Sequence, residues 1–241
     1  MEPKIRALVF DMDGLLFDSE RVVQKSWYIA GERLGYPGIG DHIYHTLGFN
    51  VVRRSEYFRS VFGEEFPGEQ FNQMTREIFH RLKEEEGVPK KPGVEALLSY
   101  GKEHGYLLGL ATSSRREYST HLLQDGGIWD YFDAAVFGDM VTHAKPDPEI
   151  YQKACEALGA APQEAVALED SPNGIRSAHA AGMRTIVVPD LVQPDGEIRR
   201  LCTWQCASLA DVIDLLKCII TAVQRTETFV RLFCAFFLRV M

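Results

Sequence analysis

The sequence predicts an α/β fold, in which a doubly wound parallel sheet carries an inserted, mainly α-helical second domain. Three observations support this prediction. Short apolar runs recur along the chain, helical patterns lie between the later runs, and one interval is much longer than the others. A chain of 241 residues is long enough for one large domain with a substantial insert.

Five short apolar runs are predicted to be strands of one sheet. Each is rich in Val, Ile, Leu or Ala and is bounded by polar residues or Gly. A continuous apolar run, as opposed to an alternating one, is typical of a strand that is buried on both faces of a parallel sheet. The runs span residues 5–10, 106–111, 134–137, 165–168 and 185–188.

Helical patterns separate the later runs and complete the alternation of strands and helices. Strands and helices that alternate at this spacing indicate right-handed βαβ units. The helical patterns span residues 94–103, 116–124, 148–158 and 174–181, and the segment ASLADVIDLL is predicted to form a closing helix.

The interval between the first two predicted strands is the exception. It holds roughly ninety residues, whereas a βα crossover needs only about thirty. Residues 20–90 are rich in helix formers and charges, and Pro89, Pro92 and Gly93 mark the return to the sheet. Because α/β folds bind ligands at the carboxyl ends of their strands, an insert directly after the first strand is expected to cover the site like a lid.

Charge and cysteine content narrow the class of protein. The formal net charge of −8 argues against a nucleic-acid binder, which needs a basic face, but leaves a phosphorylated substrate open. The five cysteines are odd in number and form no C-x-x-C pair, which suits a reducing compartment. The first residues, MEPKIRALVF, lack the apolar core of a signal peptide. We therefore expect a cytoplasmic protein without a membrane partner, either a monomer or a weak homo-oligomer.

The last segment of the chain, residues 218–241, is unusually apolar. It contains FVRLFCAFFLRVM, which is interrupted by Arg231 and Arg239 and is too short to span a bilayer. Three interpretations stay open: an adventitious extension, an oligomerisation helix, or an anchor at a membrane surface.

Two carboxylates follow the first predicted strand. Asp11 and Asp13 lie two residues apart, so both can face one pocket, and Gly14 permits a sharp turn directly after them. A calcium-binding EF-hand loop also begins D-x-D, but it requires Gly where this chain has Leu16 and Glu where it has Val22.

Three later strand ends carry further polar residues. They are Thr112-Ser113-Ser114, Lys145 within HAKPDPE, and Glu169-Asp170-Ser171. Pro146 and Pro148 are expected to hold the backbone beside Lys145 extended. Singly, each has a plain structural explanation as a helix N-cap or a surface charge. Together, four strand ends deliver acids, hydroxyls and a cation to one edge of the sheet, which predicts a site for Mg²⁺ and phosphate.

The four segments together resemble the motifs of a known family. DMDGLLFDSE, ATSS, AKPDP and LEDSPNG occur in order and are similar to the four motifs of the haloacid dehalogenase superfamily, in its phosphatase branch. The resemblance covers residues from about 4 to 217. It implies a Rossmann-like α/β core formed by residues 1–17 and 93–217, a helical cap formed by residues 18–92, and an atypical extension at 218–241.

The resemblance also implies catalytic and metal-binding roles. Asp11 would attack phosphorus and form an aspartyl-phosphate, for which it would be ionised at neutral pH without an activating base. Asp13 would protonate the leaving oxygen and then deprotonate the hydrolytic water. The Asp13 backbone carbonyl and the carboxylates of Asp11 and Asp170, with Glu169 as a further candidate, would hold Mg²⁺.

Phosphate binding is implied for a second set of residues. Thr112, the Ser113 backbone and Lys145 would contact the oxygens of the transferring phosphoryl group. Positioning and charge neutralisation would then supply most of the rate.

Within the superfamily, the sequence favours a phosphatase of a small phosphorylated metabolite. Dehalogenases lack a second acid such as Asp13. The main alternative is a sugar phosphomutase of the β-phosphoglucomutase type, whose cap histidine falls at the position of Val23 here. A non-enzymatic alternative is a phospho-accepting regulatory domain, but such receiver domains are about half this length and carry no cap.

The cap is expected to choose the substrate. The triplet Asp18-Ser19-Glu20 is similar to that of family members that act on sugar phosphates or nucleoside monophosphates, and Glu20 either faces the substrate or starts the first cap helix. A loop at Gly48-Phe49-Asn50, followed by Arg53, either faces the substrate or forms an ordinary helix junction.

Overall fold

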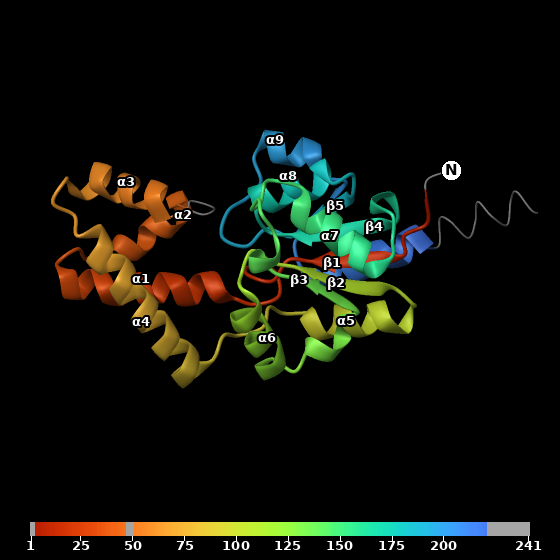
Figure 1. The fold of residues 1–241 in the computed structure, drawn as a ribbon, viewed down its shortest axis with the longest axis horizontal. Helices are drawn as coiled ribbons and strands as arrows, with labels where there is room; N and C mark the ends of the chain where they lie inside the picture. The colour runs from red at the N-terminus through yellow and green to blue at the C-terminus, as the bar shows by residue number, and fades with distance from the viewer. Residues whose placement is uncertain (1–2, 47–50, 221–241) are drawn as a thin grey trace, which may run out of the picture.

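Six parallel strands form a single sheet with the order β3-β2-β1-β4-β5-β6. The computed structural model of the chain describes residues 3–46 and 51–220. The predicted doubly wound parallel sheet is confirmed (Figure 1). A short sixth strand that was not predicted lies at its edge. The strands are β1 (Ala7–Phe10), β2 (Leu107–Ala111), β3 (Ala134–Val136), β4 (Ala165–Glu169), β5 (Arg184–Val187) and β6 (Trp204–Gln205).

Helices cover both faces of the sheet, which explains why the strand runs are continuously apolar. Leu8 and Phe10 of β1 pack on one face with helices α5 (Val94–Glu103) and α6 (Arg116–Asp125) and the helical residues 209–220. Ala7 and Val9 point to the other face, towards α7 (Glu149–Leu158) and α8 (Pro172–Ala180). All four β1 side chains are fully buried, and each large one stabilises the fold by about 1.5–3 kcal/mol. A short helix, α9 (Gly196–Leu201), packs beside α8.

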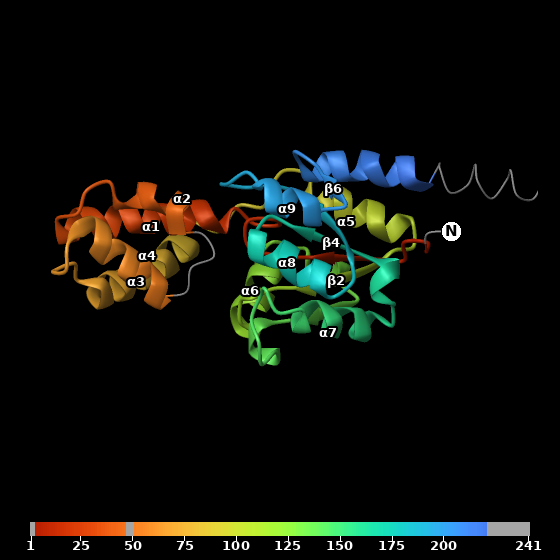
Figure 2. The same cartoon turned by 90° about the horizontal axis from the view of Figure 1, so that it is seen from above.

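The described residues of the segment 19–86, which follows β1, are mainly helical and lie beyond the carboxyl ends of the strands (Figures 1 and 2). It has its own apolar core, in which the Trp27 ring meets Phe58 and Phe71 edge-on at centroid distances of 5.4 and 6.0 Å. We call residues 19–86 the helical insert; the domain boundaries given above stay predictions. Its helices are α1 (Ser19–Leu34), η1 (Ile39–His42), α2 (Ile43–Thr46), α3 (Val51–Phe62) and α4 (Gly68–Glu86).

Two linkers join the helical insert to the sheet, and they run side by side. The Asp18 amide donates to the Pro89 carbonyl at 2.8 Å, and the Lys91 amide donates to the Leu16 carbonyl at 2.8 Å. The chain therefore leaves and re-enters the sheet region at one place, next to the end of β1.

The predicted closing helix is present at residues 209–220, where Leu209, Val212 and Leu216 pack into the apolar core. Residues 221–241, most of the apolar extension, lie outside the described residues, so its interpretation stays open. Within the described part of the chain, no helix has both the length and the hydropathy needed to cross a bilayer.

Candidate active site

The strand order brings the predicted site residues to one edge of the sheet. Because β1 lies between β2 and β4, Asp11 at the end of β1 lies between Thr112, which follows β2, and Glu169, the last residue of β4. Lys145 reaches the same place from the loop that precedes α7 and bonds to Asp11.

Lys145 is the cation at the centre of this group. Its ammonium donates to Asp11 Oδ1 at 2.5 Å and to Glu169 Oε1 at 2.7 Å. A third hydrogen bond, at 2.9 Å, goes to the Ala111 carbonyl, and the side chain is only 6% exposed. Burial alone would lower the pKa of Lys145, but the two carboxylates outweigh it and raise that pKa above its usual value, so the ammonium stays charged.

The backbone beside Lys145 is not extended as predicted. The Lys145–Pro146 peptide bond is cis. Pro148 has helical dihedral angles (φ −70°, ψ −10°) and forms the N-cap of α7. Proline at this position suits the start of a helix, because its fixed φ already matches the helical value.

Asp11 is buried beside other acids, and this changes its ionisation. Burial is the largest effect and raises the pKa of Asp11 to about 7. Lys145 lowers that pKa, while the negative charges of Glu169 and Asp13 raise it. The expectation that Asp11 is fully ionised at neutral pH is therefore incomplete, because a further cation is needed to offset the neighbouring acids. Among the described residues, its second oxygen accepts no hydrogen bond.

Asp13 faces the end of the second strand. Its Oδ2 accepts a hydrogen bond of 2.7 Å from the Ser114 hydroxyl, and burial raises the pKa of Asp13. A raised pKa suits a carboxyl group that has to hold a proton and release it near neutral pH. The N-cap interpretation of Ser114 is wrong, because α6 begins at Arg116 with Arg115 as its N-cap.

Gly14 makes the sharp turn after the two acids. It adopts φ +81°, in the left-handed region, and a Cβ atom there would lie 2.3 Å from Asp170 Oδ2. Two separate constraints therefore exclude a side chain at this position.

Replacing Gly14 with Ala is expected to displace Asp170 and to lower activity at least tenfold, while strain in the left-handed region costs about 1–2 kcal/mol of unfolding free energy. Gly35→Ala is the matched control, because Gly35 has nearly the same φ, +82°, with nothing within 4 Å of its Cβ position. Urea unfolding and phosphate-release assays on both variants check this. Equal activity of the two variants would contradict the role of the close approach to Asp170.

Glu169 has a carboxylate that is fully buried and fully bonded. Besides Lys145, its Oε1 accepts from the Tyr151 hydroxyl at 2.7 Å. Its Oε2 accepts from the amide and hydroxyl of Ser171, at 3.2 and 2.9 Å. A Cβ atom at Gly174 would lie 1.8 Å from Oε1, so glycine leaves the space that this carboxylate fills. This bonding pattern favours a residue that orients its neighbours.

The Asp170 carboxylate differs from that of Glu169 in its hydrogen bonding. It makes no side-chain hydrogen bond among the described residues, and burial, followed by the charges of Glu169 and Asp11, raises its pKa well above the usual value. Carboxylate oxygens of these three residues all lie within 4.8 Å of one another. Three clustered carboxylates around a single ammonium leave an excess of negative charge, which is the environment that a divalent cation prefers.

The residues predicted to bind phosphate lie where β2 ends. Thr112 is buried, and its Oγ1 accepts from the Ser114 amide at 3.1 Å, so its hydroxyl proton is directed elsewhere. Ser113 is exposed, and phosphate binding by its backbone stays a prediction. A Cβ atom at Gly138 would lie 2.0 Å from the Ser113 carbonyl, so glycine there allows the two loops to approach closely.

Glu20 belongs to the first turn of α1, on the side of the helical insert that meets the sheet. It is half-buried, and burial raises its pKa to about 7. The negative charges of Asp13 and Asp190 raise that pKa further, and the positive charge of Arg54 lowers it. The two interpretations of Glu20 are thus compatible, because it starts α1 and lies near the catalytic edge.

The arginine near Glu20 is Arg54, one position after the predicted Arg53. Arg53 is exposed on α3. The Arg54 guanidinium lies 5.3 Å from the centroid of the Trp27 ring and donates to Asn72 Oδ1 at 3.2 Å. Its buried Nε has no partner among the described residues. The third predicted insert residue, Asn50, lies outside the described residues.

Three residues of this site escaped prediction from the sequence. Ser114 stood in the quoted ATSS segment, but its bond to Asp13 depends on the packing of two loops. Tyr151 reads as an ordinary core residue on the apolar side of α7. Arg54 was overlooked beside Arg53, and the helical phase of α3 was the signal that separates the two.

The comparisons with known proteins decide the family. The family model described as haloacid dehalogenase-like hydrolase matches residues 8–188, which is most of the chain and includes all four motifs. The chain belongs to the haloacid dehalogenase-like hydrolases.

Individual relatives of this haloacid dehalogenase-like hydrolase are similar over most of their length. "Hexitol phosphatase B" of Escherichia coli K12 is 32% identical over 189 residues, covering 77% of this chain and 84% of its own. "Phosphorylated carbohydrates phosphatase" of Thermotoga maritima is 31% identical over 182 residues, covering 76% and 84%. The YhcW protein of Bacillus subtilis is 37% identical over 192 residues, covering 78% and 85%.

Solved structures agree with the fold. The crystal structure of CbbY from Rhodobacter sphaeroides in complex with phosphate is 28% identical, has a TM-score of 0.67, and covers 86% of this chain and 96% of its own. The predicted assignment to the phosphatase branch, as a phosphoric monoester hydrolase, is confirmed.

Proposed function

We propose that this haloacid dehalogenase-like hydrolase is a Mg²⁺-dependent phosphatase that acts through an aspartyl-phosphate on Asp11. The observation that carries the proposal is the hydrogen bond from the Lys145 ammonium to Asp11 Oδ1, while the second carboxylate oxygen accepts no hydrogen bond from the described residues. Lys145 holds the carboxylate in one orientation and favours its ionised, nucleophilic form.

Two proton transfers complete the reaction, and Asp13 carries out both. As the Asp11 oxygen bonds to phosphorus and the ester bond breaks, Asp13 gives its proton to the leaving oxygen. Asp13 then takes a proton from the water that attacks phosphorus, so that inorganic phosphate leaves and Asp11 is regenerated. The hydrogen bond from Ser114 to Asp13 Oδ2 fixes the carboxyl group for these steps.

The donor set fits a magnesium ion. Asp11 and Asp170 would hold it through carboxylate oxygens, with the Asp13 carbonyl as a further ligand. Asp170 has no competing hydrogen bond among the described residues, whereas both oxygens of Glu169 are already bonded. We therefore propose that Glu169 orients the metal ligands and does not itself bind the metal. Held by these ligands, Mg²⁺ would supply positive charge to neutralise the phosphoryl group during its transfer. Lys145 and Thr112 would contact the phosphoryl oxygens.

The proposed substrate is a small phosphorylated metabolite of the sugar-phosphate kind. Relatives are named for phosphorylated carbohydrates and for hexitols. Glu20 supports this choice, because it is a half-buried carboxylate near Asp13 that can accept hydrogen bonds from substrate hydroxyls. A nucleoside monophosphate offers ribose hydroxyls to the same group. We propose that the cytoplasm is the site of action.

The residue at position 23 argues against the phosphomutase alternative. Val23, which stands where such enzymes carry a histidine, packs against the apolar core of the helical insert. A valine side chain supplies neither an acid nor a base at that position.

The test is phosphate release from a panel of phosphate esters that includes hexitol phosphates, hexose phosphates, nucleoside monophosphates and p-nitrophenyl phosphate. We expect release in Mg²⁺, loss of release in EDTA, and recovery when Mg²⁺ is restored. Hexose 1-phosphate should give free sugar and inorganic phosphate. Its conversion to hexose 6-phosphate would instead support the mutase, and absence of Mg²⁺-dependent release from every ester would refute the proposal.

A further inference from the structure

The loop that follows β5 contains a buried carboxylate which the proposed chemistry does not use. The Asp190 side chain is only 3% exposed. Its Oδ1 accepts from Arg21 Nη1 at 3.0 Å and from Lys91 Nζ at 2.5 Å. Arg21 lies in the first turns of α1, and Lys91 lies in the linker that returns to the sheet. One carboxylate of the loop after β5 therefore bonds both to the first helix of the helical insert and to the linker that returns to the sheet.

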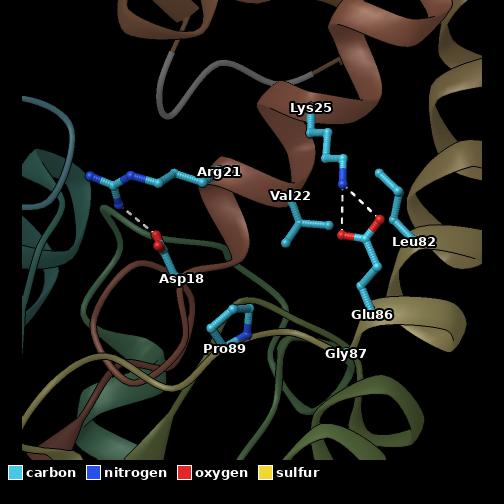
Figure 3. A pocket seen from close by; sticks show the side chains of 8 residues that line it. All are labelled: Asp18, Arg21, Val22, Lys25, Leu82, Glu86, Gly87 and Pro89. Carbon is cyan, nitrogen blue, oxygen red and sulfur yellow. Dashed lines mark hydrogen bonds and ion pairs between the residues drawn. The ribbon is translucent and has the colours of Figure 1, made fainter.

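The start of α1 has no ordinary side-chain cap. Asp18 is the N-cap residue, but its side chain makes no capping hydrogen bond to the helix. Asp18 Oδ1 instead accepts from Arg21 Nη1 at 2.6 Å. Figure 3 shows Asp18 and Arg21 pointing towards one another beside a small cavity of about 190 Å³ at the junction with the insert. Arg21 is thus held from outside the helix by two carboxylates.

The residue after Asp190 strengthens the same contact by burial. Leu191 packs against the apolar core of the helical insert, although it belongs to the loop after β5. An ion pair and an apolar contact from adjacent residues thus fasten this loop to the insert. Because the Asp190 charge is buried, salt screens its ion pairs less than it screens pairs on the open surface.

We propose that Asp190 is a positioning residue for the reaction. It anchors Arg21 and thereby fixes the adjacent Glu20 where that carboxylate meets the leaving group of the substrate. The inference rests on the proposed function of Glu20. Glu20 makes no hydrogen bond of its own among the described residues, so its location is set by the turn of helix that carries it. Arg21 is its neighbour in that turn, and its ion pair with Asp190 joins the turn to the loop after β5.

The first test compares two substrates. Asp190→Asn is expected to raise KM for a hexitol phosphate roughly tenfold, which is the value of one well-placed charged hydrogen bond. It should change KM and kcat for p-nitrophenyl phosphate by less than about twofold, because that leaving group offers no hydroxyl to Glu20. Arg21→Gln should give the same pattern. Its side chain is 52% exposed, so this variant folds even where Asp190→Asn does not.

The second test asks whether Asp190 acts through Glu20. In a Glu20→Gln background, the Asp190→Asn exchange should add less than about a twofold change in KM, because the group that it positions is already impaired. Asp214→Asn makes the same chemical change at an exposed carboxylate that pairs with Lys217, and it should leave all constants unchanged.

Two outcomes would overturn the inference. One is an unchanged KM for hexitol phosphate in both the Asp190→Asn and Arg21→Gln variants. The other is an equal loss for both substrates, or full additivity with Glu20→Gln, which would assign Asp190 to the stability of the fold alone. Failure of the proposed function looks different, because the wild-type protein would then release no phosphate from either ester.

Discussion

Replacing Asp11 with Asn should lower Mg²⁺-dependent phosphate release by at least about 10⁴-fold, the scale seen when a catalytic nucleophile is removed. The amide is nearly the same size as the carboxylate but carries no charge and cannot attack phosphorus. Asp11 lies at the end of β1, whose four residues are buried, so the substituted side chain should occupy the same place. Steady-state assays with the best ester of the panel measure the loss. Asp214→Asn, the same change on the surface, should keep full activity.

The same variant should be more stable than the wild type when metal is absent. Burial raises the pKa of Asp11 from 3.8 to about 7 in the folded protein, so the folded state binds this proton more tightly than the unfolded state does. The stability contributed by the protonated group is complete below pH 4 and is lost as the pH rises towards 7. Over that window the wild type should lose roughly 1.4 kcal/mol per pH unit relative to Asp11→Asn.

Thermal unfolding in EDTA between pH 5 and pH 8 checks whether the stability difference between the two proteins changes with pH in this direction. The melting temperature of Asp11→Asn minus that of the wild type should rise with pH, and Mg²⁺ should raise the melting temperature of the wild type more than that of the variant. A difference that falls with pH would show that Asp11 is stabilised as an anion without metal.

Replacing Lys145 with Met should lower activity about 10²–10³-fold, which is the loss expected when one preorganised donor to a transferring group is deleted. It should also destabilise the fold by about 3–5 kcal/mol at pH 7, because Asp11 and Glu169 would then be buried without their shared cation. Lys145 donates to both carboxylates and is 6% exposed, so water cannot replace it easily.

Lys153→Met is the control for this change. Lys153 also pairs with a carboxylate, that of Glu149, but its side chain is 40% exposed. An exposed pair of this kind contributes at most about 1 kcal/mol. Urea unfolding and phosphate release are measured for both variants. Comparable losses of stability in the two variants would show that the burial of Lys145 does not account for its contribution to stability.

The strand ends were the part of the site that the sequence predicted well. Short continuous apolar runs, bounded by polar residues or Gly, indicate strands that are buried on both faces, and the polar residue that follows each run then lies at the carboxyl edge. Prediction and structure agree to the residue for helix α5, Val94–Glu103, because its apolar residues recur with helical spacing between Gly93 and His104. Strand β6 was missed because two residues, Trp204 and Gln205, are too few to show a period.

Contacts between distant loops were beyond prediction from one sequence. Nothing local distinguishes Asp190 from any other loop carboxylate, since its partners Arg21 and Lys91 lie 169 and 99 residues away. The pKa of Asp11 was misjudged for the same reason. The ordinary pKa of a carboxyl group applies in water, and the shift of that pKa depends on burial and on charges that only the folded chain brings together.

The pairing of the two linkers has a consequence for how such a protein can change. Residues 16–18 and 89–91 lie side by side and share hydrogen bonds. The two ends of the helical insert are therefore held together next to the sheet, whatever the length of the insert. The paired linkers close the loop that contains the insert, and lengthening such a loop adds little to the entropic cost of closing it. A different insert grafted at this junction would leave strand order and the catalytic acids in place. Substrate choice and bond-breaking chemistry are therefore separable properties of this chain, open to independent variation in evolution or by design.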